Sequence, residues 1–185
     1  MFAQTLQRHF GKRVSTHVSL GQTRIDVDAN DYLDVMQRLR DEPDLCFEQL
    51  IDLCGIDHSA YGKTLWTGRR FAVVSQLLSI SKNRRARIRC FVPDDIFPSI
   101  PSIRPVWNSA DWFEREAFDL FGIVFTGHGN LRRLLTDYGF DGHPLRKDFP
   151  VSGKVEARYD AGRGRVVNEP TTAKAREIMP RRFPE

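Results

Sequence analysis

Two neighbouring stretches constrain the fold most strongly, because together they predict a β-hairpin. Phe71–Ile80 is a long apolar run without a charge and has the length of a strand. In Arg84–Val92, arginines alternate with small or apolar residues, which places one face in a core and the other outside it. Only three residues connect the two runs. The charged side, with Arg85, Arg87 and Arg89, is predicted to be a solvated or partner-facing sheet face, and a nucleic-acid surface is the alternative.

The composition limits what the chain can bind or cross by itself. With 41% hydrophobic and 28% charged residues among 185, it can bury a core. No apolar run reaches the roughly 18 residues that a membrane-spanning helix needs, and no signal-peptide core is expected at the N-terminus. The three cysteines are widely spaced and form no Cys-x-x-Cys pair, so neither a zinc ribbon nor an iron–sulfur cluster is predicted. They are expected to be ordinary thiols in a reducing compartment.

The remaining patterns place the hairpin in an α+β domain, with helices packed on one face of a mixed sheet. Asn30 or Asp31 is predicted to cap a helix that runs to about Arg40. The other predicted elements are a short helix over 2–10, strands over 14–20 and 23–27, a second helix over 47–53, a loop over 59–70 and a connection without regular structure over 93–105.

The net charge is unevenly distributed. Residues 1–143 hold as many acidic as basic side chains, whereas residues 144–185 hold 10 Lys and Arg against 6 Asp and Glu, which accounts for the whole charge of +4. The sequence therefore predicts a neutral globular domain over 1–143, followed by an extended, irregular basic tail over 144–185 that could not fold alone.

A third helix is predicted to begin after Asn108 and to end at Gly122, a residue suited to a left-handed C-cap. Phe113, Ala117, Leu120 and Phe121 are expected to form its core stripe. Arg115 lies four residues from both Asp111 and Asp119 and could pair with either. Trp112 and Phe118 fall outside the apolar stripe. The helix is therefore expected to pack on two sides, against the core and against either the tail or another protein.

The stretch after this helix combines many charged side chains. Leu131–Leu135 is predicted to form one or two helical turns, and residues 136–150 an irregular folded loop. A metal or acid–base site could be assembled on paper from Glu114, Glu116, His128, Asp137, His143 and Asp148. The spacing of these residues matches no metal motif, and Arg132, Arg133, Arg146 and Lys147 balance the acids. Mutual neutralisation in a buried or interfacial network is therefore predicted instead of catalysis.

The same stretch carries a family resemblance. Four segments, Glu114–Ile123, Gly127-His128, Leu131–Phe140 and Gly142–Pro150, resemble the signature of the thirty-kilodalton subunit family of respiratory complex I, the C subunits of NADH-quinone oxidoreductase. The resemblance extends over about residues 30–170. It departs from the family at Gly129, where proline is usual, and at Phe121, where tyrosine is frequent.

The resemblance implies a structural subunit of a proton-translocating NADH:quinone oxidoreductase that binds no cofactor of its own. FMN, the iron–sulfur clusters and quinone would be held by other subunits. The implied partners are the forty-nine-kilodalton-type subunit (the D subunit), the PSST-type subunit (the B subunit) and a neighbouring ferredoxin-like subunit. The implied place is the peripheral arm, on the cytoplasmic side of a bacterial inner membrane or the matrix side in mitochondria. The equivalent subunit of a membrane-bound hydrogenase or a photosynthetic NDH complex is the alternative.

Within that implied role, no catalytic, cofactor-binding or metal-binding residue is predicted, and the charged stretch becomes a subunit interface. The interface residues predicted from the sequence are Glu114, Arg115, Glu116, Asp119, His128, Arg132, Arg133, Asp137, Tyr138, His143, Pro144, Arg146, Lys147 and Asp148.

Overall fold

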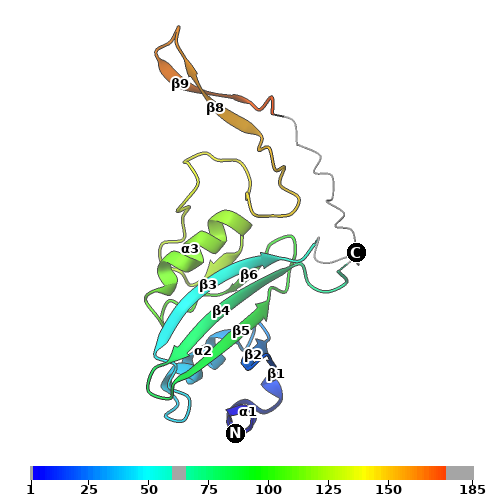
Figure 1. The fold of residues 1–185 in the computed structure, drawn as a ribbon, viewed down its shortest axis with the longest axis vertical. Helices are drawn as coiled ribbons and strands as arrows, with labels where there is room; N and C mark the ends of the chain where they lie inside the picture. The colour runs from blue at the N-terminus through cyan, green and yellow to red at the C-terminus, as the bar shows by residue number, and fades with distance from the viewer. Residues whose placement is uncertain (1, 60–65, 174–185) are drawn as a thin grey trace, which may run out of the picture.

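In the computed structural model, which describes residues 2–59 and 66–173, five strands form one mixed sheet (Figure 1). In spatial order they are β1 (Val14–Ser19), β2 (Gln22–Val27), β5 (Arg84–Phe91), β4 (Phe71–Ser79) and β3 (Gln49–Asp57). β2 and β5 are parallel, and the other neighbours are antiparallel. The predicted hairpin is confirmed as β4 and β5.

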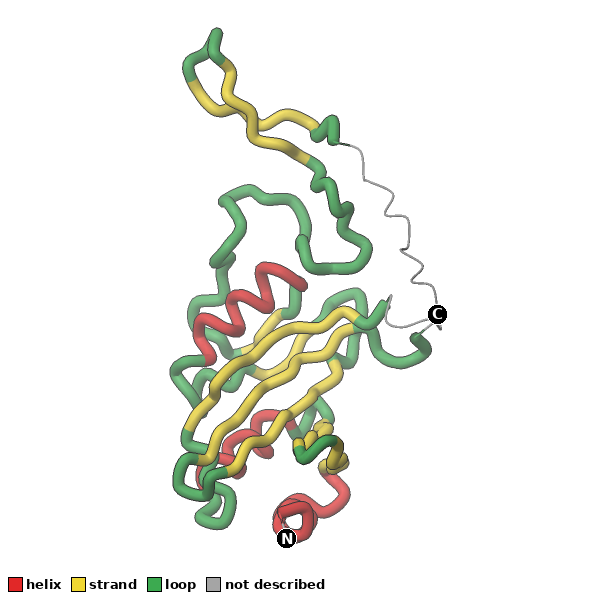
Figure 2. Tube along the Cα trace, viewed as in Figure 1, coloured by secondary structure: helices red, strands yellow, loops and turns green. Residues whose placement is uncertain are grey.

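The helices cover one face of this sheet, as the α+β prediction required (Figure 2). They are α1 (Phe2–Phe10), the 3₁₀ turn η1 (Gly11–Arg13), α2 (Tyr32–Asp41) and α3 (Ala110–Phe121). Ala86, Ile88 and Cys90 point from β5 into the core beneath them and are at most 2% exposed. Asp31 occupies the N-cap position of α2, but its side chain does not cap the helix and binds Arg13 instead.

The segment predicted as a second helix over 47–53 is a strand, so that prediction was wrong. β3 pairs with β4 in antiparallel register, but the register shifts between Leu50 and Asp52. This bulge puts Leu50 and Leu53, three residues apart, on the buried side. A spacing of three is typical of a helix, which explains why the alternation of a strand was not visible in the sequence.

Two short strands connect the sheet region to α3. β6 (Ser99–Pro101) lies within the segment predicted to be without regular structure, and it pairs in parallel with β7 (Val124–Thr126). In the sequence, α3 lies between these two strands. It ends where predicted, at Gly122, whose φ of 73° is left-handed. The pairing of β7 with β6 therefore anchors the chain just after the C-terminal end of α3.

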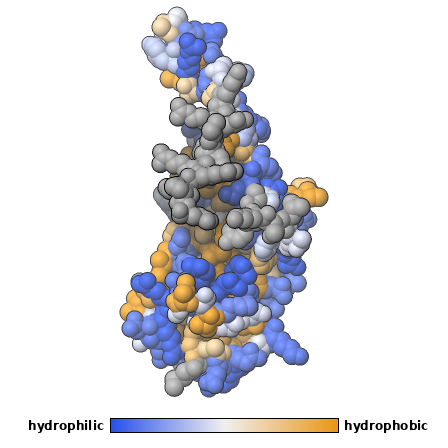
Figure 3. Space-filling model, turned by 45° about the vertical axis from the view of Figure 1, so that its right-hand side comes forward, coloured by the Kyte–Doolittle hydropathy of each residue, from blue (hydrophilic) through white to orange (hydrophobic). Residues whose placement is uncertain are grey.

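The C-terminal tail is only partly irregular. Beyond the loop that follows α3, β8 (Val155–Asp160) and β9 (Arg165–Pro170) form an antiparallel hairpin that projects away from the body (Figure 1). The space-filling view shows the same projection at its upper end (Figure 3). The prediction of an irregular tail was therefore wrong for the hairpin, and its part over 174–185, like 60–65 of the predicted loop, lies outside the described residues. Within the part that is described, no helix is long and apolar enough to cross a membrane.

Candidate subunit-docking site

The third helix buries charge as well as apolar side chains. Glu114 and Asp119 are fully buried and Arg115 is 7% exposed. Arg115, which by spacing could pair with Asp111 or Asp119, instead donates from its guanidinium to the carbonyls of Arg132 and Arg133, each at 3.2 Å. The helix does pack on two sides, and its second side is covered by the loop of its own chain.

Asp119 is the centre of that second contact. Its carboxylate accepts the backbone N–H groups of Leu134, Leu135 and Thr136 at 2.7–2.9 Å, and it forms an ion pair with Arg133 at 2.8 Å. Burial alone would raise the pKa of Asp119, but these hydrogen bonds and that of the Thr136 hydroxyl outweigh it and hold the pKa well below its usual range. A charged Asp119 therefore organises the loop around itself.

This arrangement explains why Leu131–Leu135 is not helical. The N–H groups of Leu134, Leu135 and Thr136 would donate to carbonyls one turn earlier in a helix, but they donate to Asp119 instead. The helical prediction for this segment was wrong, and the side chain of Leu135 is 61% exposed. The carboxylate of Asp119, on another element of the fold, has replaced the local hydrogen bonds of a helix.

The C-terminal end of α3 is closed by the next part of the loop. His143 Nδ1 lies 2.8 Å from the carbonyl of Asp119, and Arg146 Nε donates to that of Phe121 at 2.6 Å. These contacts satisfy carbonyls that a helix end leaves without partners. A Cβ on Gly122 would lie 2.4 Å from the Arg146 guanidinium and 2.6 Å from the His143 ring, so a larger residue there would displace these side chains as well as adopt a strained, positive φ. Burial lowers the pKa of His143, which favours the neutral imidazole.

A second carboxylate ties this loop to the sheet. Asp57, at the end of β3, accepts two hydrogen bonds from Arg70 at 2.8 and 3.1 Å and one from the backbone N–H of Lys147 at 2.9 Å. Arg70 also pairs with Asp148 at 2.8 Å. Burial would raise the pKa of Asp57, but the bonds from Arg70 and Lys147 lower it below its usual range. Sequence reasoning missed Asp57 and Arg70, because no local motif links Asp57 to a partner 90 positions away.

Glu114 has a different environment and holds the segment after β6 against the helix. It lies 2.6 Å from the Ser102 hydroxyl and 2.7 Å from the backbone nitrogen of Ile103, whose N–H it accepts. No cation forms an ion pair with it in the described chain. Burial therefore dominates and raises the pKa of Glu114 to about 7. Ser102 was another residue that the sequence did not single out.

The residues that could have formed a metal or acid–base site are not brought together. Glu114 faces Ser102, Asp148 faces Arg70, and the ring of His128 lies 3.2 Å from the carbonyl of Asp111. Among the described residues there is no group of three His, Cys, Asp or Glu side chains that could hold a metal ion. The charged stretch therefore forms a fastening, which is the set of contacts by which Asp119 and Asp57 hold α3, the loop and the sheet together.

The predicted interface residues fall into three classes, which are buried, partly covered and exposed. Glu114, Arg115 and Asp119 are buried within the chain itself, so direct contact of these side chains with another protein is ruled out for this conformation. Glu116, Arg133, His128, His143, Pro144 and Arg146 are partly covered. Arg132, Asp137, Tyr138, Lys147 and Asp148 are exposed, and Tyr138 is exposed to 96%. Three further apolar side chains of α3 and its loop are exposed nearby in the chain: Trp112, Leu135 and Leu145.

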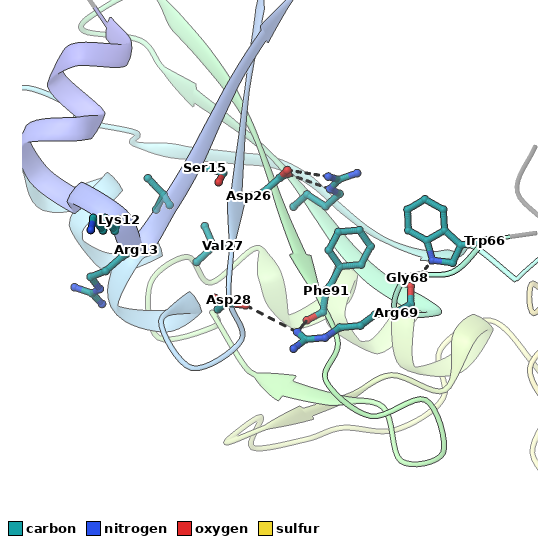
Figure 4. A pocket seen from close by; sticks show the side chains of 12 residues that line it. Lys12, Arg13, Ser15, Asp26, Val27, Asp28, Trp66, Gly68, Arg69 and Phe91 are labelled. Carbon is teal, nitrogen blue, oxygen red and sulfur yellow. Dashed lines mark hydrogen bonds and ion pairs between the residues drawn. The ribbon is translucent and has the colours of Figure 1, made fainter.

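A separate hollow of about 430 Å³ lies across the sheet end, beside η1 and β1 (Figure 4). Its charged side chains largely neutralise each other. Arg89 binds Asp26 through two hydrogen bonds of 2.8 and 3.0 Å, and Arg69 reaches Asp28 at 3.9 Å. None of its lining residues belongs to the fastening around α3, so the two features are distinct.

Comparison with known proteins identifies the family. Residues 25–155 match the family of the 30 kDa subunit of the respiratory-chain NADH dehydrogenase. The chain is 59% identical to the C subunit of NADH-quinone oxidoreductase from Cupriavidus pinatubonensis, over 95% of this chain and 89% of that protein. The C subunit from Dechloromonas aromatica is 57% identical over 97% and 90%.

Solved structures agree. The trypsin-resistant fragment (1-134) of Nqo5 superimposes with a TM-score of 0.61 and 29% identity, over 70% of this chain and 98% of the fragment. A chain of an archaeal membrane-bound sulfane sulfur reductase shares the fold, with a TM-score of 0.66 at 18% identity over 80% of this chain and 84% of that one. On the family and sequence matches, the chain belongs to the thirty-kilodalton subunit family of complex I and is a C subunit of NADH-quinone oxidoreductase.

Proposed function

We propose that this subunit supports electron transfer by holding neighbouring subunits of the peripheral arm in place, and that it binds no redox cofactor itself. The observation that carries the proposal is the fastening around Asp119 and Asp57. Its charged groups are satisfied within the chain and leave no convergent set of reactive side chains in the described part. The fastening holds the loop over 131–149 in place. It thereby positions the exposed side chains of that loop and the start of the tail.

The tail hairpin is the best candidate for a contact with a neighbour. An isolated two-stranded hairpin is marginally stable in water. Here Val155, Tyr159 and Val166 lie on the same side of the ribbon and are 57–64% exposed, so this side presents an uncovered apolar surface. Covering these side chains would stabilise both the hairpin and the partner contact. Because Arg146, Lys147 and Asp148 are bound to α3 and the sheet, we expect the docking arm to begin after Pro150, carried by the folded domain before it.

The comparison with Nqo5 supports this division. A trypsin-resistant fragment of that protein ends at its residue 134, and the superposition covers 70% of this chain. A folded body that resists proteolysis, with a more accessible extension, is what a docking arm requires in the absence of its partners. Following the family resemblance, the proposed partners are the forty-nine-kilodalton-type, PSST-type and ferredoxin-like subunits, with membrane association only through the complex.

Truncation after Pro150 tests the proposal. The shortened chain keeps the Asp119 and Asp57 fastenings and all three helices, so it should fold, with the helical circular dichroism signal retained and a cooperative unfolding transition. It should fail to enter the NADH-oxidising complex on a native gel. If the shortened chain assembles normally and the complex retains its NADH:quinone activity, the docking-arm proposal is wrong.

A point variant provides a finer test. Tyr159→Ser with Val166→Ser removes apolar surface from one side of the hairpin and should reduce the amount of assembled complex. Arg163→Ser lies in the turn between the strands, where it is exposed, and serves as the matched control that should assemble normally. The complex that still forms from the double variant should have ordinary turnover, because only docking is affected.

A further inference from the structure

The face of the five-stranded sheet opposite the helices is not covered by any element of the described chain (Figure 2). The cross-strand register assigns Arg85, Arg87 and Arg89 of β5 to this face, and places Arg24 of β2 directly beside Arg87. Gln76 of β4 lies on the other side of Arg87. A row of arginines therefore runs along the middle strand of an open sheet face.

Within the described chain, two of these arginines, Arg85 and Arg87, lack the hydrogen-bond and ion-pair partners that most arginines in the body of the molecule have. Arg24 and Arg89 share Asp26 as their ion-pair partner. Arg85 and Arg87 are exposed, and neither donates a hydrogen bond nor forms an ion pair within the described residues. Asp52 lies opposite Gln76 and brings one negative charge to this end of the face, so it offsets only part of the charge of the two guanidinium groups.

The surface between the two unpaired arginines is hollowed. A depression of about 390 Å³ is lined by both of them together with Gln76, Gln22 and Ile51. Ile51 occupies the β3 bulge and is 45% exposed. The depression thus combines two cations at its rim, amide groups that can bind a backbone, and one apolar contact, which are the features of a peptide-binding groove.

We propose that this groove, Arg85–Arg87 with Ile51 and Gln76, docks an extended acidic segment of another subunit of the complex. Alternate residues of a strand are about 6.6–6.8 Å apart, so carboxylates at alternate positions of an extended partner match the spacing of the two arginines. Charge argues against this chain's own end as the occupant, because residues 174–185 contain four basic and two acidic side chains. The proposal rests on the family assignment and is independent of the docking arm.

A photo-crosslinking experiment on the assembled complex tests this proposal. p-Benzoylphenylalanine is placed at Ile51, the complex is purified and irradiated, and the captured peptide is sequenced by mass spectrometry. We expect a peptide of a different subunit with Asp or Glu at alternate positions. Val18, which is exposed on the helix-covered side of the sheet, is the control position and should not capture the same peptide.

Charge variants complete the test. Arg85→Gln with Arg87→Gln should lower the crosslinking yield about fivefold, as expected for two partly exposed ion pairs, whereas Arg85→Lys with Arg87→Lys should retain most of it. Lys82→Gln, in the exposed β4–β5 turn, controls for loss of charge alone. The proposal is overturned if no peptide is captured, if the partner is a basic peptide, nucleic acid, a second copy or residues 174–185, or if the glutamine variants crosslink as well as the original.

This outcome can be separated from that of the docking arm. Truncation after Pro150 leaves Arg85, Arg87 and Ile51 unchanged, and the glutamine variants leave the hairpin unchanged. Normal assembly of the truncated chain would contradict the docking arm alone, whereas failure to capture an acidic peptide would contradict the groove alone.

Discussion

At the scale of single residues, the molecule separates two kinds of buried carboxylate. Asp119 and Asp57 are surrounded by N–H donors and an arginine, and each has a pKa below its usual range. Glu114 is fully buried and forms no ion pair with a described residue, and burial raises its pKa. The first two therefore depend on remaining ionised, whereas the third is most stable when protonated.

Asp119→Asn should strongly destabilise the chain. Three backbone N–H groups and Arg133 would lose a charged acceptor, and breaking a buried ion pair typically costs about 3–5 kcal/mol. Chemical denaturation of the purified chain measures this change in the free energy of unfolding. Asp137→Asn, at an exposed position of the same loop, is the control and should change it by less than about 0.5 kcal/mol. Equal, small effects of both variants would show that the Asp119 contacts contribute little.

The two kinds of buried carboxylate should contribute to stability with opposite dependence on pH. Asp57 and Asp119 have lowered pKa values in the folded state, so their contribution is present above the unfolded value of about 3.9 and is lost as the pH falls further. Glu114 has a raised pKa, so its contribution is fully present below the unfolded value of about 4.3 and is lost as the pH rises toward 7.

Glu114→Gln isolates the second effect. Glutamine can accept the Ile103 N–H and donate to Ser102, as the protonated acid does. Urea unfolding at pH 5 and at pH 7.5 should show a smaller decline in stability for the variant than for the original chain. Glu116→Gln, on the same helix, should keep the original decline. If Glu114→Gln leaves the decline unchanged, the raised pKa is not its cause.

Gly122→Ala tests the close approach of the loop to the end of α3. The substitution adds a left-handed strain of about 1–2 kcal/mol and a Cβ that collides with Arg146 and His143. Gly127→Ala is the matched control, because its φ of 85° is also positive but nothing lies within 4 Å of the added Cβ. Thermal unfolding should show a clearly larger loss for Gly122→Ala, and equal losses would remove the steric argument.

At the scale of elements, the sequence predicted those whose pattern is local. Alternation identified β5, and Gly122 marked the end of α3. It did not identify β3, because the bulge between Leu50 and Asp52 interrupts the alternation. Nor could it show that Leu131–Leu135 is not helical, because the acceptor for its N–H groups is a side chain on another element. The candidate site was found from its charge density, but the division into buried and exposed residues depends on contacts distant in sequence.

At the scale of the whole molecule, the parts have separate tasks. The sheet and helices provide a stable body, the fastening around Asp119 and Asp57 orients the loop, and the hairpin extends beyond it (Figure 1). Such a subunit affects turnover through the positions of its neighbours. Losing a contact should therefore reduce how much complex assembles before it alters the chemistry of the complex that remains.

Hydrogen–deuterium exchange, compared between the isolated chain and the purified complex, tests the central claim most directly. The account predicts that amides of residues 155–170 exchange rapidly in the isolated chain and are strongly protected in the complex, whereas β4 and β5 exchange slowly in both. Equally rapid exchange of residues 155–170 in both states would show that the hairpin docks on nothing, and would contradict the account.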